Sequence, residues 1–351
     1  MRVIVVGATG NVGTALLRSL ADESSVDSIV GLARRVPNAS LAKVDWAAVD
    51  VETDALEPHF RGADAVVHLA WRIQPSRRLN ELWATNVHGS NRVFDAVARA
   101  GVASLVYASS VGAYAPAPKD RLVDESWPVD GVPTSFYSRH KAEVERRLDR
   151  FEVEHPRTRV VRLRPALIFQ RGSAYEQRRL FAGPLVPSPL LRRGVLPFVP
   201  AVRALRFQVV HAEDVANAYR LAIVSDARGA FNVAAEPVLE GDAFATALAA
   251  RPIHLSPRLV RTAMAAAFRL HVQPSPPGWF DLGLRAPLLD STRARNELAW
   301  APQHDGERTL RELIDGIRDN AGAPTPPLDP EESGRLRRRE VATLAGEREQ
   351  M

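Results

Sequence analysis

The sequence predicts an α/β fold in which a doubly wound parallel sheet carries a smaller C-terminal substrate lobe. Short β-branched runs alternate with helical segments from the first residue onward, as in parallel sheets whose strands are joined by helices. The runs AVVHLA and SLVYASS are nearly all apolar, as expected for strands covered by helices on both faces. Between them, ELWATNVHGSNRVFDAVARAG has apolar residues at helical spacing and ends at a glycine that can stop a helix.

The order of these segments suggests how the chain is divided. Residues 1–170 are expected to form the sheet domain and residues 171–321 the lobe. Residues 207–235 return to the sheet, because RFQVVH, AEDVANAYRLAIV and GAFNVAA are typical of a strand, a helix and a strand. Prolines crowd the stretch from Pro184 to Pro200, which predicts a loop facing the substrate. Residues 322–351 are rich in proline and charge, which predicts a flexible tail, with a docking helix over 335–348 as the alternative.

Composition excludes several classes of site. The chain has no cysteine, so disulfides, thiolate metal sites and cysteine nucleophiles are ruled out. The net charge of +5 arises from 46 basic and 41 acidic residues that are interspersed along the chain, so no nucleic-acid partner is expected. The histidines, among them His68, His88, His140 and His211, show no ligand spacing, so no metal site is predicted.

The hydrophobic segments predict neither a signal peptide nor a membrane span. The apolar run at the N-terminus is short and passes directly into a glycine-rich turn. The most apolar later stretch, LVRTAMAAAFRL, contains Arg261 and Arg269, so it lacks the roughly 20 apolar residues that a span requires. The expected location is the cytoplasm.

A glycine-rich turn predicts a dinucleotide site of the Rossmann type. Gly7, Gly10 and Gly13 follow a predicted strand and open a predicted helix, the context that distinguishes this fingerprint from a chance group of glycines. Gly7 permits the tight turn, Gly10 lets the backbone approach a pyrophosphate, and Gly13 allows close helix packing. The N-terminus of the helix attracts the phosphates.

A second group of residues has the chemistry of proton transfer. Tyr137 and Lys141 in YSRHK are four residues apart and therefore share one face of a helix. An ammonium group beside a phenol favours the phenolate, so the tyrosine can exchange a proton while hydride moves to or from a nicotinamide. A lysine that merely covers an aromatic ring is the alternative for this pair. Ser110 stands in SSVGAY, directly after the predicted strand.

The motifs GATGNVG, SSVGAY and YSRHK, in this order, resemble those of the extended short-chain dehydrogenases/reductases, the NAD-dependent epimerase/dehydratase family. The resemblance runs from residue 1 to about 235, with a looser similarity at LLDSTRARNELAWAP. It implies an NAD(P)-dependent enzyme that transfers hydride between the cofactor and a secondary alcohol or carbonyl. Ser110, Tyr137 and Lys141 would be its catalytic residues. Trp71 and the pair Tyr114 and Ala115 depart from the usual residues of the family.

The same resemblance implies the cofactor site. Arg34 and Arg35 stand at the end of the second strand where NAD-preferring members carry an acid, which favours NADP, with NAD as the alternative. Two surface arginines without a ligand remain the competing interpretation. The implied cofactor-binding residues are Gly7, Thr9, Gly10, Asn11, Val12, Gly13, Arg34, Arg35, Asp50, Val51, Leu69, Ala70, Trp71, Asn86, Ser109, Tyr137, Lys141 and Pro165.

The sequence leaves the substrate open. A nucleotide sugar is one expectation, since arginines at positions 192, 193, 203 and 206 could meet a diphosphate or could equally be solvated. A carbonyl reductase of a steroid-like or flavonoid-like substrate is the alternative, suited by the Pro- and Leu-rich stretch from Phe181 to Val199. A non-catalytic protein that senses NADP or binds a partner is the contrasting class. The resemblance also implies a homodimer formed through the helices that bear Asn86 and Tyr137.

Overall fold

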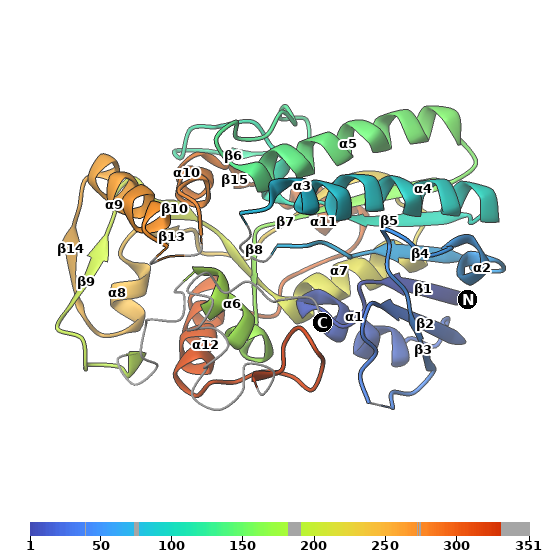
Figure 1. Cartoon of the computed structure of the whole chain (residues 1–351), viewed down its shortest axis with the longest axis horizontal. Helices are drawn as coiled ribbons and strands as arrows, with labels where there is room; N and C mark the ends of the chain where they lie inside the picture. The colour runs from blue at the N-terminus through green and yellow to red at the C-terminus, as the bar shows by residue number, and fades with distance from the viewer. Residues whose placement is uncertain (39, 74–76, 182–190, 272, 274, 331–351) are drawn as a thin grey trace.

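A seven-stranded parallel sheet forms the centre of the protein, seen in a computed structural model that describes residues 1–38, 40–73, 77–181, 191–271, 273 and 275–330 (Figure 1). Its strand order is β12-β7-β5-β4-β1-β2-β3, and each neighbouring pair is parallel. This confirms the predicted doubly wound sheet. The strands are β1 (Arg2–Val6), β2 (Ser28–Ala33), β3 (Val44–Ala48), β4 (Ala65–His68), β5 (Ser104–Ala108), β7 (Arg159–Pro165) and β12 (Gly229–Val233).

Two hydrophobic cores lie on the two faces of this sheet. Side chains alternate along a strand, so Val3 and Val5 enter one core while Ile4 and Val6 enter the other. Helices α1 and α7 cover the first face, and α4 and α5 cover the second (Figure 1). The bounds of these helices are α1 (Asn11–Ala21), α4 (Gly89–Ala100), α5 (Phe136–Glu154) and α7 (Ala212–Val224). Short segments α2 (Glu57–Phe60), α3 (Leu79–Trp83) and a π-helical turn (Ala84–His88) precede α4.

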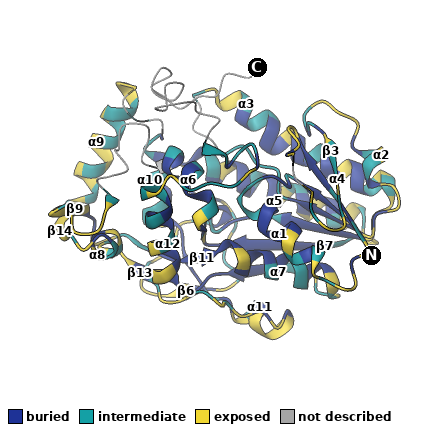
Figure 2. Ribbon diagram, turned by 90° about the horizontal axis from the view of Figure 1, so that it is seen from below, coloured by how far each residue is buried: buried dark blue, intermediate teal, exposed yellow. Residues whose placement is uncertain are grey.

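Outside the seven-stranded sheet the described chain forms short strand pairs and further helices. The parallel pairs are β8 (Leu167–Phe169) with β11 (Val209–His211), β9 (Phe198–Ala201) with β14 (Arg251–His254), and β6 (Leu122–Val123) with β15 (Leu288–Leu289). β10 (Arg206–Phe207) and β13 (Leu239–Glu240) are antiparallel. β10 and β11, in the segment expected to return to the sheet, pair with β13 and β8 instead. The helices are α6 (Ala174–Phe181), α8 (Ala243–Ala247), α9 (Pro257–Arg269), α10 (Gly278–Arg285), α11 (Thr292–Glu297) and α12 (Gly306–Arg318). Figure 2 shows α9 at the end of the lobe, and no residue of this helix is buried.

The segment that follows α12 packs against the rest of the chain. Leu328 is fully buried, and the Thr325 hydroxyl donates a hydrogen bond to the carbonyl of Thr9 in the glycine-rich turn, at 2.9 Å. The prediction of a solvated tail therefore does not hold for residues 322–330. Residues 331–351, with the alternative docking helix at 335–348, lie outside the described residues, as do Pro184, Pro187 and Pro189.

Candidate functional site

The three glycines of the turn are required for three different reasons. Gly7 has φ +88, and a Cβ there would lie 2.5 Å from the backbone nitrogen of Ala70. A Cβ on Gly13 would lie 2.6 Å from the carbonyl group of Ala8. At Gly10 such a Cβ would meet only the Gly7 carbonyl oxygen, at 3.6 Å, an ordinary van der Waals contact without overlap. The surroundings therefore match the packing roles predicted for Gly7 and Gly13 and leave room for a ligand at Gly10.

The N-terminus of α1 is free to receive an anion. Gly10 is the N-cap residue and has no side chain with which to cap the helix. The amides of the first turn and the positive end of the helix dipole therefore suit a phosphate. The Asn11 side chain turns toward the lobe instead, where it donates to the Ile168 carbonyl at 3.1 Å and accepts from Gln170 at 2.8 Å. Val12 follows it, half-buried, in the same turn.

Substituting the glycines one at a time separates folding from cofactor binding. Gly13→Ala is expected to destabilise the protein by about 1–3 kcal/mol, because its methyl group would overlap backbone atoms that have no room to move. The free energy of unfolding of Gly10→Ala should lie within about 0.5 kcal/mol of the wild-type value, as expected for a site without such overlap. The variant should nevertheless bind a dinucleotide more weakly. Chemical denaturation and dinucleotide titration measure the two effects. Equal dinucleotide affinity in Gly10→Ala and the wild type would contradict the assignment of this turn.

The residues that end β2, β3 and β4 lie at the same carboxyl edge of the sheet. Arg34 and Arg35 are exposed directly after β2. The Asp50 carboxylate accepts from the backbone of Glu52 at 2.8 Å, and Val51 is buried. Leu69 and Ala70 follow β4, and Pro165 ends β7, which β5 separates from β4 in the sheet. The edge therefore gathers the predicted cofactor residues from four strands.

Asn86 supports this edge through the backbone. It is fully buried in the π-helical turn, where its side chain accepts from the Arg72 amide at 2.7 Å and donates to the Arg72 carbonyl at 3.0 Å. Both bonds hold the segment that follows Trp71. In this structure Asn86 thus acts on the predicted cofactor surface as a positioning residue.

Ser110 and Tyr137 meet where β5 approaches the first turn of α5. Ser110 caps a short 3-10 turn by accepting from the Gly112 amide at 3.0 Å, and its Oγ lies 3.4 Å from where a Cβ on Gly112 would stand. The tyrosine ring lies against Gly112, where a Cβ would be 2.8 Å from a ring carbon. Burial raises the pKa of Tyr137 to about 12, against the opposing effect of Ser110. At neutral pH the phenol is therefore protonated in this structure.

Lys141 lies one helical turn beyond Tyr137 and is almost fully buried. Its ammonium donates to the Ala108 carbonyl at 2.6 Å and stands 3.5 Å from the ring centroid of Trp71. Burial lowers the pKa of Lys141 well below its usual value, while the nearby Glu145 carboxylate opposes the shift. The predicted triad of Ser110, Tyr137 and Lys141 therefore lies in one region, with Nζ of Lys141 5.9 Å from the Tyr137 ring centroid and covered by the indole of Trp71.

Two tryptophans flank the Tyr137 ring. Trp71 meets it edge-on with centroids 6.0 Å apart, and Trp279 of α10 packs at a tilt with centroids 4.9 Å apart. Trp279 belongs to the lobe and was not predicted as a site residue. Its local sequence gives no sign that it packs against Tyr137, which lies far away in the chain. The lobe therefore supplies one wall of the site.

A buried ionic network lies directly beneath the triad. The Glu145 carboxylate accepts from the Ser109 hydroxyl at 2.5 Å, from Arg164 at 2.8 and 3.0 Å, and from Arg162 at 3.0 Å. Burial alone would raise the pKa of Glu145, but Arg164, Arg162 and the serine together lower it to about 2. Because the Ser109 hydroxyl is directed to Glu145, it faces this network in the structure rather than the predicted cofactor.

Arg164 extends the network away from the triad. It donates to the Tyr114 hydroxyl at 3.0 Å, and that hydroxyl donates to the Asn232 side chain at 2.7 Å. Asn232 also donates to the carbonyls of Val123 and Asp290. These bonds connect β7, β12 and the residue after the 3-10 turn to β6 and to the segment after β15. The network therefore ties the sheet edge to the lobe.

Comparison with known proteins places this site in a family. Residues 3–234 match the model of the NAD dependent epimerase/dehydratase family. The chain belongs to this family. Its membership confirms the resemblance expected from the glycine, serine and tyrosine motifs, and with it an enzyme of the extended short-chain dehydrogenase/reductase type.

Individual members of the epimerase/dehydratase family differ in how much of this chain they match. An L-arabinose 1-dehydrogenase (NAD(P)(+)) of Haloferax volcanii is 34% identical over 110 residues, which span 31% of this chain and 41% of that enzyme. A UDP-glucose 4-epimerase of Mycolicibacterium smegmatis is 29% identical over 324 residues, 86% of this chain and 94% of the epimerase. The structure of MoeE5 in complex with UDP-glucuronic acid and NAD has a TM-score of 0.67 at 20% identity, covering 91% of this chain and 100% of MoeE5. This structural likeness confirms the fold.

No helix within the described part of the chain is both long and apolar enough to cross a membrane.

Proposed function

We propose that this member of the epimerase/dehydratase family transfers hydride between a bound nicotinamide dinucleotide and a secondary alcohol or carbonyl. The observation that carries the proposal is the packing of the Tyr137 ring and the Ser110 hydroxyl around Gly112, with Lys141 one helical turn away, at the sheet edge that holds the glycine-rich turn. The open surface at Gly10 and the uncapped N-terminus of α1 fit a dinucleotide pyrophosphate.

The triad has a distinct task for each member. A bound nicotinamide supplies the hydride donor or acceptor. Tyr137 passes its proton to a substrate carbonyl or receives one from a substrate hydroxyl, and Ser110 orients that oxygen. The Lys141 ammonium, close to the phenol, stabilises the phenolate when the proton has left. Trp71 and Trp279 exclude water from this exchange.

We propose a nucleotide-diphosphate sugar as substrate. Support comes from the UDP-glucose 4-epimerase that matches most of the chain. Arg192, Arg193 and Arg203 are exposed in the lobe and could meet a diphosphate, whereas Arg206 already pairs with Glu240 at 2.9 Å. An apolar carbonyl compound is the second candidate, favoured by the two tryptophans beside Tyr137.

A pair of assays tests these proposals. The purified protein is incubated with UDP-glucose and a catalytic amount of oxidised cofactor, and separately with NADPH and a flavonoid ketone. Conversion of the sugar, detected by NMR, supports an epimerase. Loss of nicotinamide absorbance with the ketone supports a reductase. Tight cofactor binding with no turnover across a panel of sugars and ketones would favour the non-catalytic alternative.

We also propose NADP as the preferred cofactor, because no acidic residue replaces Arg34 and Arg35 at the end of β2. Arg34→Asp is expected to weaken NADPH binding about tenfold or more, since a guanidinium bond to a phosphate is worth about 1.5–3 kcal/mol. NADH binding should stay equal or improve. Arg18→Asp is the matched control, because Arg18 is likewise exposed, in the last turn of α1. Tighter NADH than NADPH binding by the wild type would overturn the preference.

For assembly we propose a homodimer through α4 and α5, the helices next to Asn86 and Tyr137. Light scattering gives the mass in solution, and a monomer at assay concentrations would contradict the proposal.

A further inference from the structure

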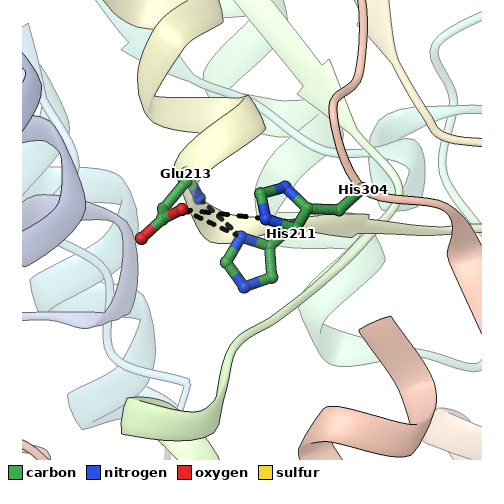
Figure 3. Close-up of side chains that lie close together, drawn as sticks. All are labelled: His211, Glu213 and His304. Atoms are coloured by element: carbon green, nitrogen blue, oxygen red, sulfur yellow. Dashed lines mark hydrogen bonds and ion pairs between the residues drawn. The ribbon is translucent and has the colours of Figure 1, made fainter. Parts of the chain in front are cut away.

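Two histidines from distant parts of the sequence come together at the junction of the sheet domain and the lobe (Figure 3). His211 ends β11 and is the N-cap residue of α7, and its side chain is 5% exposed. His304 lies directly before Asp305, the N-cap residue of α12, and its side chain is 22% exposed. The two imidazole rings stack with centroids 4.0 Å apart. The two histidines are far apart in the sequence, so the spacing of histidines along the chain does not predict the pair.

The Glu213 carboxylate completes the group. Its Oε2 atom is 3.9 Å from His211 Nδ1 and 3.8 Å from His304 Nε2. One ligand atom from each of the three residues lies within 4.8 Å of the others. Figure 3 shows the carboxylate facing one nitrogen of each ring. Two imidazole nitrogens and one carboxylate oxygen are a donor set that divalent transition metals accept.

The other nitrogen of each ring has a carboxylate partner. His304 Nδ1 is 3.2 Å from an Asp214 oxygen, and His211 Nε2 is 3.4 Å from a Glu312 oxygen. Metal-binding histidines have such an outer partner almost without exception, because the partner fixes the tautomer and leaves a lone pair on the nitrogen that faces the metal. On its inner side His211 Nδ1 is unprotonated and accepts from the Glu213 amide at 3.3 Å, a long N-cap bond that a metal ion at this nitrogen would replace.

The charges around the group also suit a cation. The first turn of α7 carries Glu213 and Asp214, and Glu312 of α12 faces His211 from the other side. These carboxylates outweigh the partial positive charge at the N-terminus of α7. Of the arginines in α12, Arg311 pairs with Glu307.

We propose that His211, Glu213 and His304 form a binding site for one divalent transition-metal ion, with Zn²⁺ as the best-matched metal. A tetrahedral zinc ion with bonds of about 2.0–2.1 Å places its ligand atoms about 3.4 Å apart. The three ligand atoms lie within 4.8 Å of one another, so their separations must shorten by up to about 1.4 Å, through rotation of the two imidazole rings and of the Glu213 side chain, which is 58% exposed. The fourth position is left to water. The ion would join the start of α7 to the segment before α12.

Metal binding to this site is measured on the full chain after treatment with EDTA and dialysis. Co²⁺ is titrated and followed by its visible absorption, and Zn²⁺ is then added as competitor. The proposal expects one saturable Co²⁺ site per chain, displaced by Zn²⁺, and a rise of several degrees in melting temperature with saturating Zn²⁺.

Three variants decide whether the bound ion occupies this site. His304→Asn and Glu213→Gln should each weaken Co²⁺ binding at least tenfold and abolish the thermal shift. Glu213 is largely exposed, so its substitution tests the site without disturbing the core. His254→Asn, at an exposed histidine in β14, should bind as the wild type does. No saturable binding, or binding equal in all variants, would overturn the proposal. Neither result depends on hydride transfer.

Discussion

Tyr137→Phe is expected to lower the rate of hydride transfer by about 10²–10⁴-fold, the usual contribution of a positioned proton donor or acceptor. The variant keeps the ring that packs against Trp71, Trp279 and Gly112, so the fold and the cofactor surface should be preserved. Dinucleotide affinity, measured by titration, should change by less than about threefold, a shift below about 0.7 kcal/mol. Nicotinamide absorbance or NMR with the substrate found active in the assays above measures the rate.

Tyr107→Phe is the matched control for this experiment. Tyr107 is also buried, at the end of β5, and its hydroxyl has no hydrogen-bond partner among the described residues. Removing that hydroxyl breaks no bond, so turnover should stay within about twofold of the wild type, a change of about 0.4 kcal/mol. Full activity in Tyr137→Phe would remove the phenol from the mechanism. Loss of dinucleotide binding in Tyr137→Phe would show that the substitution had disturbed the packing of the ring and had not removed the phenolic proton alone.

Glu145→Gln is expected to cost about 3–5 kcal/mol of folding free energy, the range found when one partner of a buried ion pair is removed. The carboxylate is the shared acceptor for Arg162 and Arg164, both of which are buried. A neutral amide would leave these two guanidinium groups without their central counter-charge. Urea denaturation followed by circular dichroism measures the loss.

Glu143→Gln tests whether burial of the ion pairs is the cause of the large loss of stability expected for Glu145→Gln. Glu143 lies on the same helix and pairs with Arg146 and Arg147, but Arg146 is half exposed, so its removal should cost less than about 1 kcal/mol. Equal losses in the two variants would contradict the account of the network.

Acid should reproduce part of the effect of Glu145→Gln. The pKa of Glu145 is lowered to about 2 in the folded protein, below the value of about 4.3 expected in the unfolded chain. The stabilisation is therefore complete above about pH 4.3 and is lost as the pH falls toward 2. As the pH falls from about 4.3 to 2, the difference in free energy of unfolding between the wild type and Glu145→Gln should therefore become smaller.

The sequence predicts the sheet and the triad because their signals are local. Strand runs, the glycine spacing and the Tyr137 and Lys141 pair each depend on residues within a few positions of one another. The order of the motifs along the chain then places them at one edge, since parallel strands share their carboxyl ends.

The buried network escaped the sequence analysis because burial of a charge is a tertiary property. Glu145 stands in EVERRLDRFEVE, a helix whose mixed charges are typical of a solvated face. The available signal was in β7, where Arg162 and Arg164 interrupt a strand that helices should cover on both faces. Two arginines in such a strand require buried carboxylates, although the sequence does not say which ones.

The bond between Thr325 and Thr9 has a consequence for biosynthesis. It joins residues 316 positions apart, so the glycine-rich turn acquires this partner only after residue 325 has been synthesised. Strands β1, β2 and β4 can pair earlier, because all three lie within residues 1–68. The glycine-rich turn of the nascent chain therefore lacks this hydrogen bond until residue 325 has left the ribosome.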